Sequence, residues 1–198
     1  QHDNITVFEN TLSAFDHALE TAGIWGIELD FRWTKDLHPV VAHDPDLQRL
    51  FGSNLRIAET TLAELKQHCP LVPTLEEVLL RYGGKLHLMV EAKEEHYPQP
   101  EKQNMILKEL FAPLKPREDF HLLSLDPEML VLVKFVDTSA KIPVADFNAK
   151  TLSKISLNEK YAGLGGHYLL LHKKIVKQHL DCGQKIGVGY PKSKNNLF

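Results

Sequence analysis

Carboxylates occur at two places in this sequence with a spacing that suits metal binding. Glu28 and Asp30 are separated by one residue, Leu29, and Glu91 ends a later apolar run. Residues two apart in a β-strand point to the same side, so we expect Glu28 and Asp30 to project together. Oxygen ligands favour Mg²⁺, Ca²⁺ or Mn²⁺ over Zn²⁺, and a bound divalent cation lets neighbouring carboxylates stay ionised. These three residues are our candidate metal ligands.

Two further side chains follow apolar runs and add different chemistry. His43 follows residues 39–42, and an imidazole can act as a general acid or base near neutral pH. Lys93 is two residues after Glu91, and its ammonium group can hold an anion beside a metal ion. Together the five side chains suit an anionic ester substrate: metal and lysine neutralise phosphoryl oxygens, and the histidine moves a proton.

Each of these residues also has a plainer interpretation when taken singly. Asp30 can form a surface ion pair with Arg32, and Glu91 with Lys93 can be a neutral surface pair. A histidine such as His43 is often a structural hydrogen-bonding residue. The interpretation as a site therefore depends on the elements that bring the residues together.

Strand-like and helix-like segments alternate along most of the chain. This order predicts parallel strands joined by helical crossovers. Charged residues at the carboxyl ends of such strands meet at one edge of a parallel sheet or barrel. The residues from 43 to 54 are interpreted as a polar loop. The segments 60–65 and 74–80 both open with a hydroxyl residue and carry Glu three positions later, which is the capping-box signature of a helix start. Asn10 or Thr11 can cap the helix expected at 12–22. The expected strands are 25–31, 39–42, 86–90, 120–125, 142–145, 163–171 and 185–190, and the expected helices are 12–22, 60–65, 74–80, 105–111, 126–135, 151–161 and 174–180.

Composition limits the function classes. The chain has 198 residues, of which 43% are hydrophobic and 25% charged, which predicts one globular domain over residues 1–198. A net charge of −3 provides no basic field for nucleic acid. No apolar run has membrane-spanning length, so we expect no stable membrane insertion. Cys69 and Cys182 are far apart, which argues against a disulfide framework and favours a reducing, cytoplasmic location.

Four motifs together resemble the glycerophosphodiester phosphodiesterases. They are the segment 9–15 (ENTLSAF), Glu28-Leu29-Asp30, His43-Asp44 and Glu91-Ala92-Lys93, in the family's order and spacing. The resemblance implies an α/β fold of the TIM-type (β/α)8 barrel class. It also implies a small-molecule substrate, a glycerophosphodiester, which is hydrolysed to glycerol 3-phosphate and an alcohol with Mg²⁺ or Ca²⁺ at the barrel mouth.

The resemblance also assigns roles residue by residue. It places Glu28, Asp30 and Glu91 as metal ligands and His43 as the second of two catalytic histidines. Lys93 matches the lysine near the phosphate. Glu9 and Tyr190 match positions beside the substrate, where Tyr190 supplies an aromatic wall. Whether water or the substrate's own glycerol hydroxyl attacks phosphorus remains open.

The sequence departs from the family pattern in three places. The family's His-Arg-Gly, which ends its first strand, is absent, and Phe8 replaces a proline. Residues 189–192 read GYPK where the family often has Trp-Thr-Val-Asn. We therefore expect a barrel that lacks its first strand and its last helix. An open barrel exposes sheet edges, so either the native polypeptide is longer or another copy of the chain covers the opening.

Two other functions fit the same residues. One is a non-catalytic barrel that binds phosphorylated metabolites or a partner protein. The other is a different phosphodiester-cleaving barrel, resembling sphingomyelinase D or the phosphatidylinositol phospholipases. Such enzymes approach a membrane, and the sequence shows no obvious apolar or strongly basic segment for that purpose.

Overall fold

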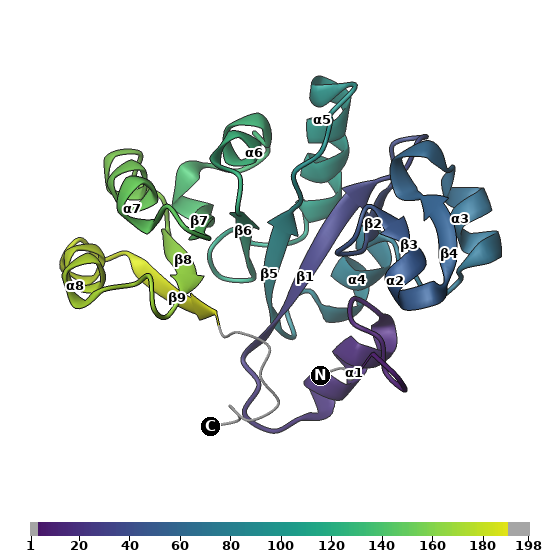
Figure 1. Cartoon of the computed structure of the whole chain (residues 1–198), viewed down its shortest axis with the longest axis horizontal. Helices are drawn as coiled ribbons and strands as arrows, with labels where there is room; N and C mark the ends of the chain where they lie inside the picture. The colour runs from purple at the N-terminus through teal and green to yellow at the C-terminus, as the bar shows by residue number, and fades with distance from the viewer. Residues whose placement is uncertain (1–3, 190–198) are drawn as a thin grey trace.

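A computed structural model describes residues 4–189, which form a curved sheet with helices packed on its outer side (Figure 1). The sheet has seven strands in the order β2-β1-β5-β6-β7-β8-β9. From β1 through β5 to β9, each strand runs parallel to the next. The strands are β1 (Gly26–Trp33), β2 (Pro39–Val41), β5 (His87–Ala92), β6 (Phe120–Ser124), β7 (Lys141–Ala145), β8 (Gly163–His167) and β9 (Lys185–Gly189).

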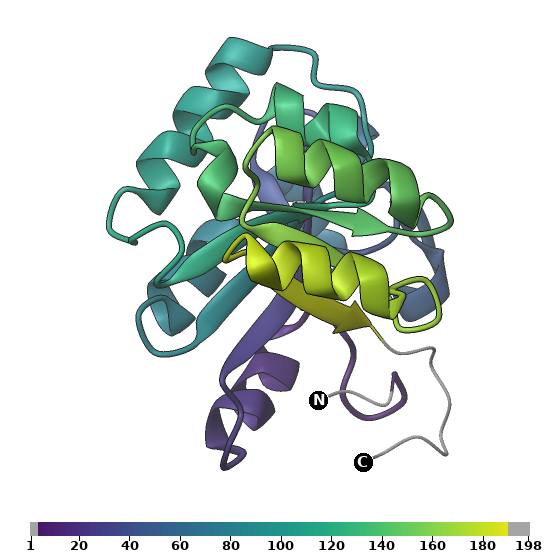
Figure 2. The same cartoon turned by 90° about the vertical axis from the view of Figure 1, so that its left-hand side faces the viewer.

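Helices follow the strands along the chain, as the alternation predicts. In Figure 2, α8 covers β9 at the front of the molecule. Within the described part of the chain the sheet remains open, and its architecture is that of a TIM-type barrel that is not closed. No helix among residues 4–189 has both the length and the apolarity needed to cross a bilayer. The helices of at least six residues are α1 (Leu12–Glu20), α3 (Leu62–His68), α4 (Leu75–Tyr82), α5 (Pro100–Phe111), α6 (Pro127–Leu132), α7 (Ala149–Asn158) and α8 (Lys173–Asp181).

The hydrophobic core lies between the sheet and the helices. Leu29, Val90 and Leu122 are fully buried in one cluster that also contains Phe15 of α1 and Leu107 of α5. Side chains alternate between the two faces of a strand, so the neighbours of these residues face the concave side. Burial of the apolar face therefore directs the carboxylates of β1 and β5 into the hollow of the sheet.

Strand β2 departs from the predicted parallel arrangement. It pairs antiparallel with β1, with Phe31 opposite Val41. The link 34–38 between the two strands is a tight turn in which Leu37 has a φ of 62°. A link of this length is too short for the crossover that a parallel pair needs. The prediction of a parallel strand is wrong here because the short turn forces a hairpin.

The region predicted as a polar loop has structure of its own. It contains β3 (Asp46–Leu47), the short helix α2 (Gln48–Phe51) and β4 (Ser53–Arg56). Gly52 ends α2 with a φ of 67°, a conformation that glycine adopts without strain. A second apolar cluster beneath this region contains Val40, Leu47, Ile57, Leu65, Cys69 and Val72. Isolated apolar residues in the sequence gave no periodic signal for this cluster.

Capping boxes at two helices match the sequence prediction. Thr61 accepts a hydrogen bond from the backbone N–H of Glu64. The carboxylate of Glu64 in turn accepts a hydrogen bond from the backbone N–H of Thr61. Thr74 and Glu77 repeat the arrangement at α4. Each box satisfies backbone donors that a helix start leaves free. The sequence therefore predicted the start of both helices correctly.

Two buried histidines form a hydrogen-bonded chain where β5 and β6 begin. His87 Nδ1 lies 2.8 Å from the carbonyl oxygen of Glu118, and His87 Nε2 lies 2.8 Å from His121 Nδ1. Since the carbonyl only accepts, His87 Nδ1 carries the proton and His87 Nε2 accepts from His121 Nδ1–H. Burial lowers the pKa of His87, and burial together with the neighbouring His87 lowers the pKa of His121 to about 4. Both rings are therefore neutral at pH 7.

The pKa of His121 predicts a loss of stability in acid. The unfolded chain takes up this proton near pH 6.5 and the folded protein only near pH 4, so stability falls as the pH drops through this window. Each group of this kind lowers the free energy of unfolding by up to about 1.4 kcal/mol for each pH unit within the window. His121→Asn keeps a donor toward His87 but cannot titrate. We expect it to lose less unfolding free energy between pH 7 and pH 5 in urea titrations.

His17→Asn is the matched control because His17 is exposed. It should retain the acid sensitivity of the unmodified protein. An equal loss in all three proteins would show that the buried pair does not control acid stability.

Candidate active site

The pairing of β1 with β5 brings the three candidate metal ligands together. Asp30 lies opposite Glu91 in the parallel register, and Glu28 lies opposite Met89. One carboxylate oxygen from each of Glu28, Asp30 and Glu91 lies within 4.8 Å of the others. The spacing in the sequence predicted that Glu28 and Asp30 lie side by side. The pairing of β1 with β5 brings Glu91 to them.

Lys93 lies between two of the carboxylates. Its Nζ is 2.6 Å from Oε1 of Glu91 and 3.2 Å from Oδ1 of Asp30. Burial lowers the pKa of Lys93, but the charges of Asp30 and Glu91 outweigh this effect and raise it. Lys93 is therefore a cation held in the hollow of the sheet.

One lysine does not balance three carboxylates. The Glu28 side chain is exposed to the open hollow of the sheet. The protein atoms that crowd it, together with the charges of Asp30 and Glu91, raise the pKa of Glu28 above its usual range. Burial and Asp30 also raise the pKa of Glu91. Three ionised carboxylates therefore need a positive charge beyond that of Lys93, which a divalent cation would supply.

Asn10 fixes the orientation of Asp30. Its Nδ2 donates to Oδ2 of Asp30 at 2.8 Å, and its Oδ1 accepts from the backbone N–H of Asp30 at 3.2 Å. Asn10 adopts a φ of 57°, which asparagine tolerates better than most residues. The sequence offered Asn10 or Thr11 as the cap of α1. Thr11 is the cap, which leaves Asn10 for the site.

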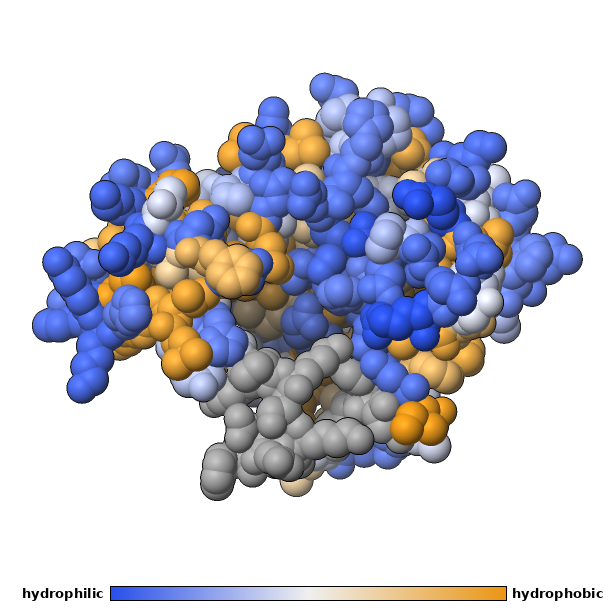
Figure 3. Space-filling view, viewed as in Figure 1, coloured by the Kyte–Doolittle hydropathy of each residue, from blue (hydrophilic) through white to orange (hydrophobic). Residues whose placement is uncertain are grey.

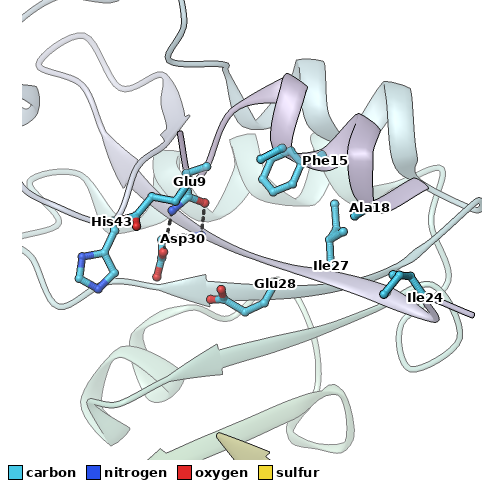
Figure 4. A pocket seen from close by; sticks show the side chains of 11 residues that line it. Glu9, Phe15, Ala18, Ile24, Ile27, Glu28, Asp30 and His43 are labelled. Atoms are coloured by element: carbon cyan, nitrogen blue, oxygen red, sulfur yellow. Dashed lines mark hydrogen bonds between the residues drawn. The ribbon is translucent and has the colours of Figure 1, made fainter. Parts of the chain in front are cut away.

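His43 reaches the site from the end of the β1–β2 hairpin. Its Nδ1 lies 2.8 Å from Oδ1 of Asp44, so this carboxylate favours the tautomer with the proton on Nδ1. Its ring lies beside Asp30 at the mouth of a pocket (Figure 4). Its side chain is about half exposed, at 52%. The second nitrogen, Nε2, is then a free base that can accept or return a proton.

Arg32 and Glu95 hold the backbone at His43. Arg32 donates from Nε and Nη2 to the carbonyl oxygen of His43 at 2.9 and 2.8 Å, and from Nη1 to Glu95 at 3.4 Å. Arg32 therefore does not form the ion pair with Asp30 that the plainer interpretation predicts. Burial raises the pKa of Glu95 to about 7, although Trp33 N–H and Arg32 bind its carboxylate. The sequence gives no local signal for either role, because Arg32 and Glu95 are 63 residues apart and meet only in the folded protein.

Glu9 belongs to a chain of charged groups at the pocket. Arg49 forms ion pairs with Glu9 and with Asp44, and Asn4 donates to Glu9 at 2.7 Å. Partial burial opposes ionisation of Asp44, but its bonds to Arg49 and His43 lower its pKa overall. Glu9 is therefore connected through Arg49 to Asp44, the carboxylate that binds His43. Tyr190, the other expected substrate neighbour, lies outside the described residues.

A pocket of about 350 Å³ joins these groups to an apolar wall. Figure 4 shows Phe15 and Ala18 of α1 on one side of β1, with Glu28 and Asp30 along the strand and His43 near its end. A second cavity of about 680 Å³ reaches Glu91 and Lys93 from the side of β6. The charged cluster is therefore open to a ligand from two directions.

The carboxylate geometry fits a hard divalent cation. Opposite ligands of Ca²⁺ lie up to about 5 Å apart and those of Mg²⁺ about 4.2 Å apart. The 4.8 Å limit within the cluster falls inside the range for Ca²⁺, and the carboxylates would have to approach one another slightly to bind Mg²⁺. All three groups offer oxygen, which suits these ions better than zinc or copper.

The Arg32–Glu95 pair gives a prediction about stability. Arg32→Met would leave Glu95 and the carbonyl oxygen of His43 unpaired in a buried place, at a cost of roughly 3 kcal/mol of unfolding free energy. Adding Glu95→Gln removes the stranded charge and should recover part of this loss. Urea titration of the single and double variants measures both effects.

The exposed pair of Arg56 and Glu59 provides the control. Arg56→Met should cost less than about 1 kcal/mol because solvent screens both partners. If Arg32→Met were as mild as the control, the pair would not stabilise the backbone at His43.

Comparisons with known proteins agree with the geometry. The model of the glycerophosphoryl diester phosphodiesterase family matches residues 2–177. A solved structure of glycerophosphodiester phosphodiesterase from Thermotoga maritima superposes with a TM-score of 0.75 and 27% identity, covering 94% of this chain and 81% of that one.

Curated relatives match shorter segments. Putative glycerophosphodiester phosphodiesterase YhdW of Bacillus subtilis is 38% identical over 96 residues, covering 43% of this chain and 39% of the relative. Human lysophospholipase D GDPD1 is 44% identical over 57 residues, covering 29% of this chain and 18% of the relative. The matched part of this chain thus spans less than half the length of either. Since the family model covers most of the sequence, the chain belongs to the glycerophosphoryl diester phosphodiesterase family.

Proposed function

We propose that this protein hydrolyses glycerophosphodiesters to glycerol 3-phosphate and an alcohol. The observation that carries the proposal is the convergence of Glu28, Asp30 and Glu91 within 4.8 Å, beside Lys93. Membership of the family supplies the substrate class. Two cavities reach this cluster, one at Glu28 and Asp30 and one at Glu91 and Lys93, and they offer room for the two arms of a phosphodiester.

Glu28, Asp30 and Glu91 are the residues that would hold Mg²⁺ or Ca²⁺. A bound cation supplies charge neutralisation at the phosphoryl oxygens. Lys93 adds a second positive group and contacts a non-bridging oxygen of the phosphate. Asn10 keeps Asp30 in place through two hydrogen bonds, so the ligand set is oriented before a substrate arrives.

His43 is the group that moves the proton. Asp44 accepts from Nδ1–H, which leaves Nε2 free to take a proton from the attacking hydroxyl or to return one to the leaving alcohol. The attacking group is water or the glycerol hydroxyl of the substrate, and the latter route would give a cyclic phosphate. Detection of that product with a slow substrate distinguishes the two routes.

Metal dependence is the first test of this proposal. We expect chelation with EDTA to abolish hydrolysis of glycerophosphocholine by the full-length protein, and Mg²⁺ or Ca²⁺ to restore it. Glu91→Gln should weaken binding of the restoring cation at least tenfold in calorimetric titration, because removal of a charged ligand lowers affinity. Glu59→Gln, at an exposed glutamate, is the control. Activity that persists in EDTA would refute the metal assignment.

The role of His43 is tested separately. His43→Ala should lower kcat for glycerophosphocholine by roughly 100- to 10,000-fold, the usual contribution of general acid–base catalysis. Binding of the cation should change little, because His43 is not one of the three candidate metal ligands. His38→Ala removes an exposed histidine of the same hairpin and should leave kcat intact. Turnover preserved in His43→Ala would remove this residue from the mechanism.

A further inference from the structure

Three basic side chains line a pocket at the end of the sheet opposite the charged cluster. The pocket has a volume of about 450 Å³, and Arg117, Lys160 and Lys185 form part of its wall. Arg117 comes shortly before β6, Lys160 comes shortly before β8, and Lys185 begins β9. The strands are parallel, so these residues lie where the strands begin, whereas Glu91 and Lys93 lie where β5 ends. We call this space the basic pocket.

The basic pocket is separate from the candidate active site. The carboxylates of the charged cluster face the hollow of the sheet, and Figure 3 shows the face of the molecule with this hollow, much of it covered by hydrophilic side chains. Among the described residues, none that lines the two cavities at the charged cluster also lines the basic pocket. A ligand in the basic pocket would therefore not occupy the place of the substrate.

The positive charge of the basic pocket has no counter-charge in its wall. The other described residues that line the pocket are all neutral. Within residues 4–189, each of the other four arginines forms an ion pair with a carboxylate, but Arg117, Lys160 and Lys185 form none. The chain has 26 acidic and 23 basic residues, so the lack of acidic partners is a local feature. An anion in the pocket would relieve the repulsion among the three cations.

Two of the three cations have a backbone conformation that their residue types disfavour. The φ of Arg117 is 74° and that of Lys160 is 55°. Glycine and asparagine adopt such left-handed conformations at lower cost. The N–H of Arg117 donates to the carbonyl oxygen of Phe120 at 2.8 Å, which holds this turn. Backbone strain of this kind is concentrated at ligand sites in many proteins.

The charge of the basic pocket acts on the protein interior. Burial and the neighbouring His87 lower the pKa of His121, and the charges of Lys185 and Arg117 add to this effect. Both cations therefore act on one buried side chain at the start of β6. Protein between charges screens them less than water does, so an anion beside these two cations would be attracted more strongly than at an open surface.

A phosphate group matches the donors of the basic pocket. The guanidinium of an arginine donates two parallel hydrogen bonds to phosphate, and lysines add point charges. Ser139, which is half-buried in the wall, offers a hydroxyl donor. The volume of about 450 Å³ lies within the range of small-molecule sites, roughly 300 to 1,000 Å³. We propose that the basic pocket binds a phosphate group, either as the free anion or as the monoester of a small metabolite.

The test is a titration of the full-length protein with inorganic phosphate in EDTA at low ionic strength, followed by the NMR shifts of the backbone amides. We expect the amide of Gly183 in the pocket wall to shift. The double variant Arg117→Gln with Lys160→Gln should bind phosphate roughly tenfold more weakly, because it removes two charge-assisted contacts. Both side chains are exposed, so their replacement should leave the fold intact.

Lys102→Gln with Lys108→Gln is the matched control. It changes the net charge equally at two exposed lysines of α5, outside the basic pocket, and should keep the affinity. An equal loss in both double variants would overturn the proposal, because phosphate would then respond only to net charge. Acetate that binds as tightly as phosphate would also contradict it.

Ribose 5-phosphate distinguishes the two sources of phosphate. Tighter binding than that of inorganic phosphate would support a monoester, whose organic part fills the remaining volume. Equal binding would support the free anion. If instead the shifts appear only around Lys93 and the double variant binds normally, phosphate occupies the charged cluster and the proposal is wrong. These titrations involve no turnover, so their result is independent of the proposed function.

Discussion

The parallel pairing of β1 with β5 is the constraint on which the site depends. It places Asp30 opposite Glu91 and brings Glu28 within reach, so three carboxylates face one hollow. Their mutual repulsion is offset in part by Lys93, which contacts two of them. The apolar neighbours Leu29 and Val90 hold this register because a slip by one residue would bury the charges and expose the core. The core and the charged cluster thus lie on opposite faces of the same strands.

The β1–β2 hairpin positions His43, which none of the parallel strands carries. Because β2 runs back along β1, the chain returns to the level of Asp30, where Ala42 N–H donates to the carbonyl oxygen of Asp30 at 3.0 Å. His43 follows directly and so reaches the carboxylates from the side. A crossover to a parallel strand would have required many more residues. The short turn is therefore a functional part of the fold.

Paired charged groups around the hairpin keep its end in place. Arg32 binds the carbonyl oxygen of His43 and pairs with Glu95, and Arg49 connects Glu9 with Asp44. Such groups are costly to remove from water unless each finds a partner. The partners come from segments far apart in the sequence, so these networks form only when the sheet and the hairpin have folded.

The sequence alone determined the alternation of strands and helices, the capping boxes of α3 and α4, and the candidate residues Glu28, Asp30, His43, Glu91 and Lys93. Local rules suffice for these features, because strand periodicity and helix caps depend on neighbours within a few residues. Their catalytic and ligand roles remain proposals, as does that of Tyr190. Only the tertiary structure decided the direction of β2, the small cluster beneath β3 and β4, the Asn10–Asp30 bonds and the Arg32–Glu95 pair. Each of these depends on contacts between distant segments, and one sequence carries no local signal for such contacts.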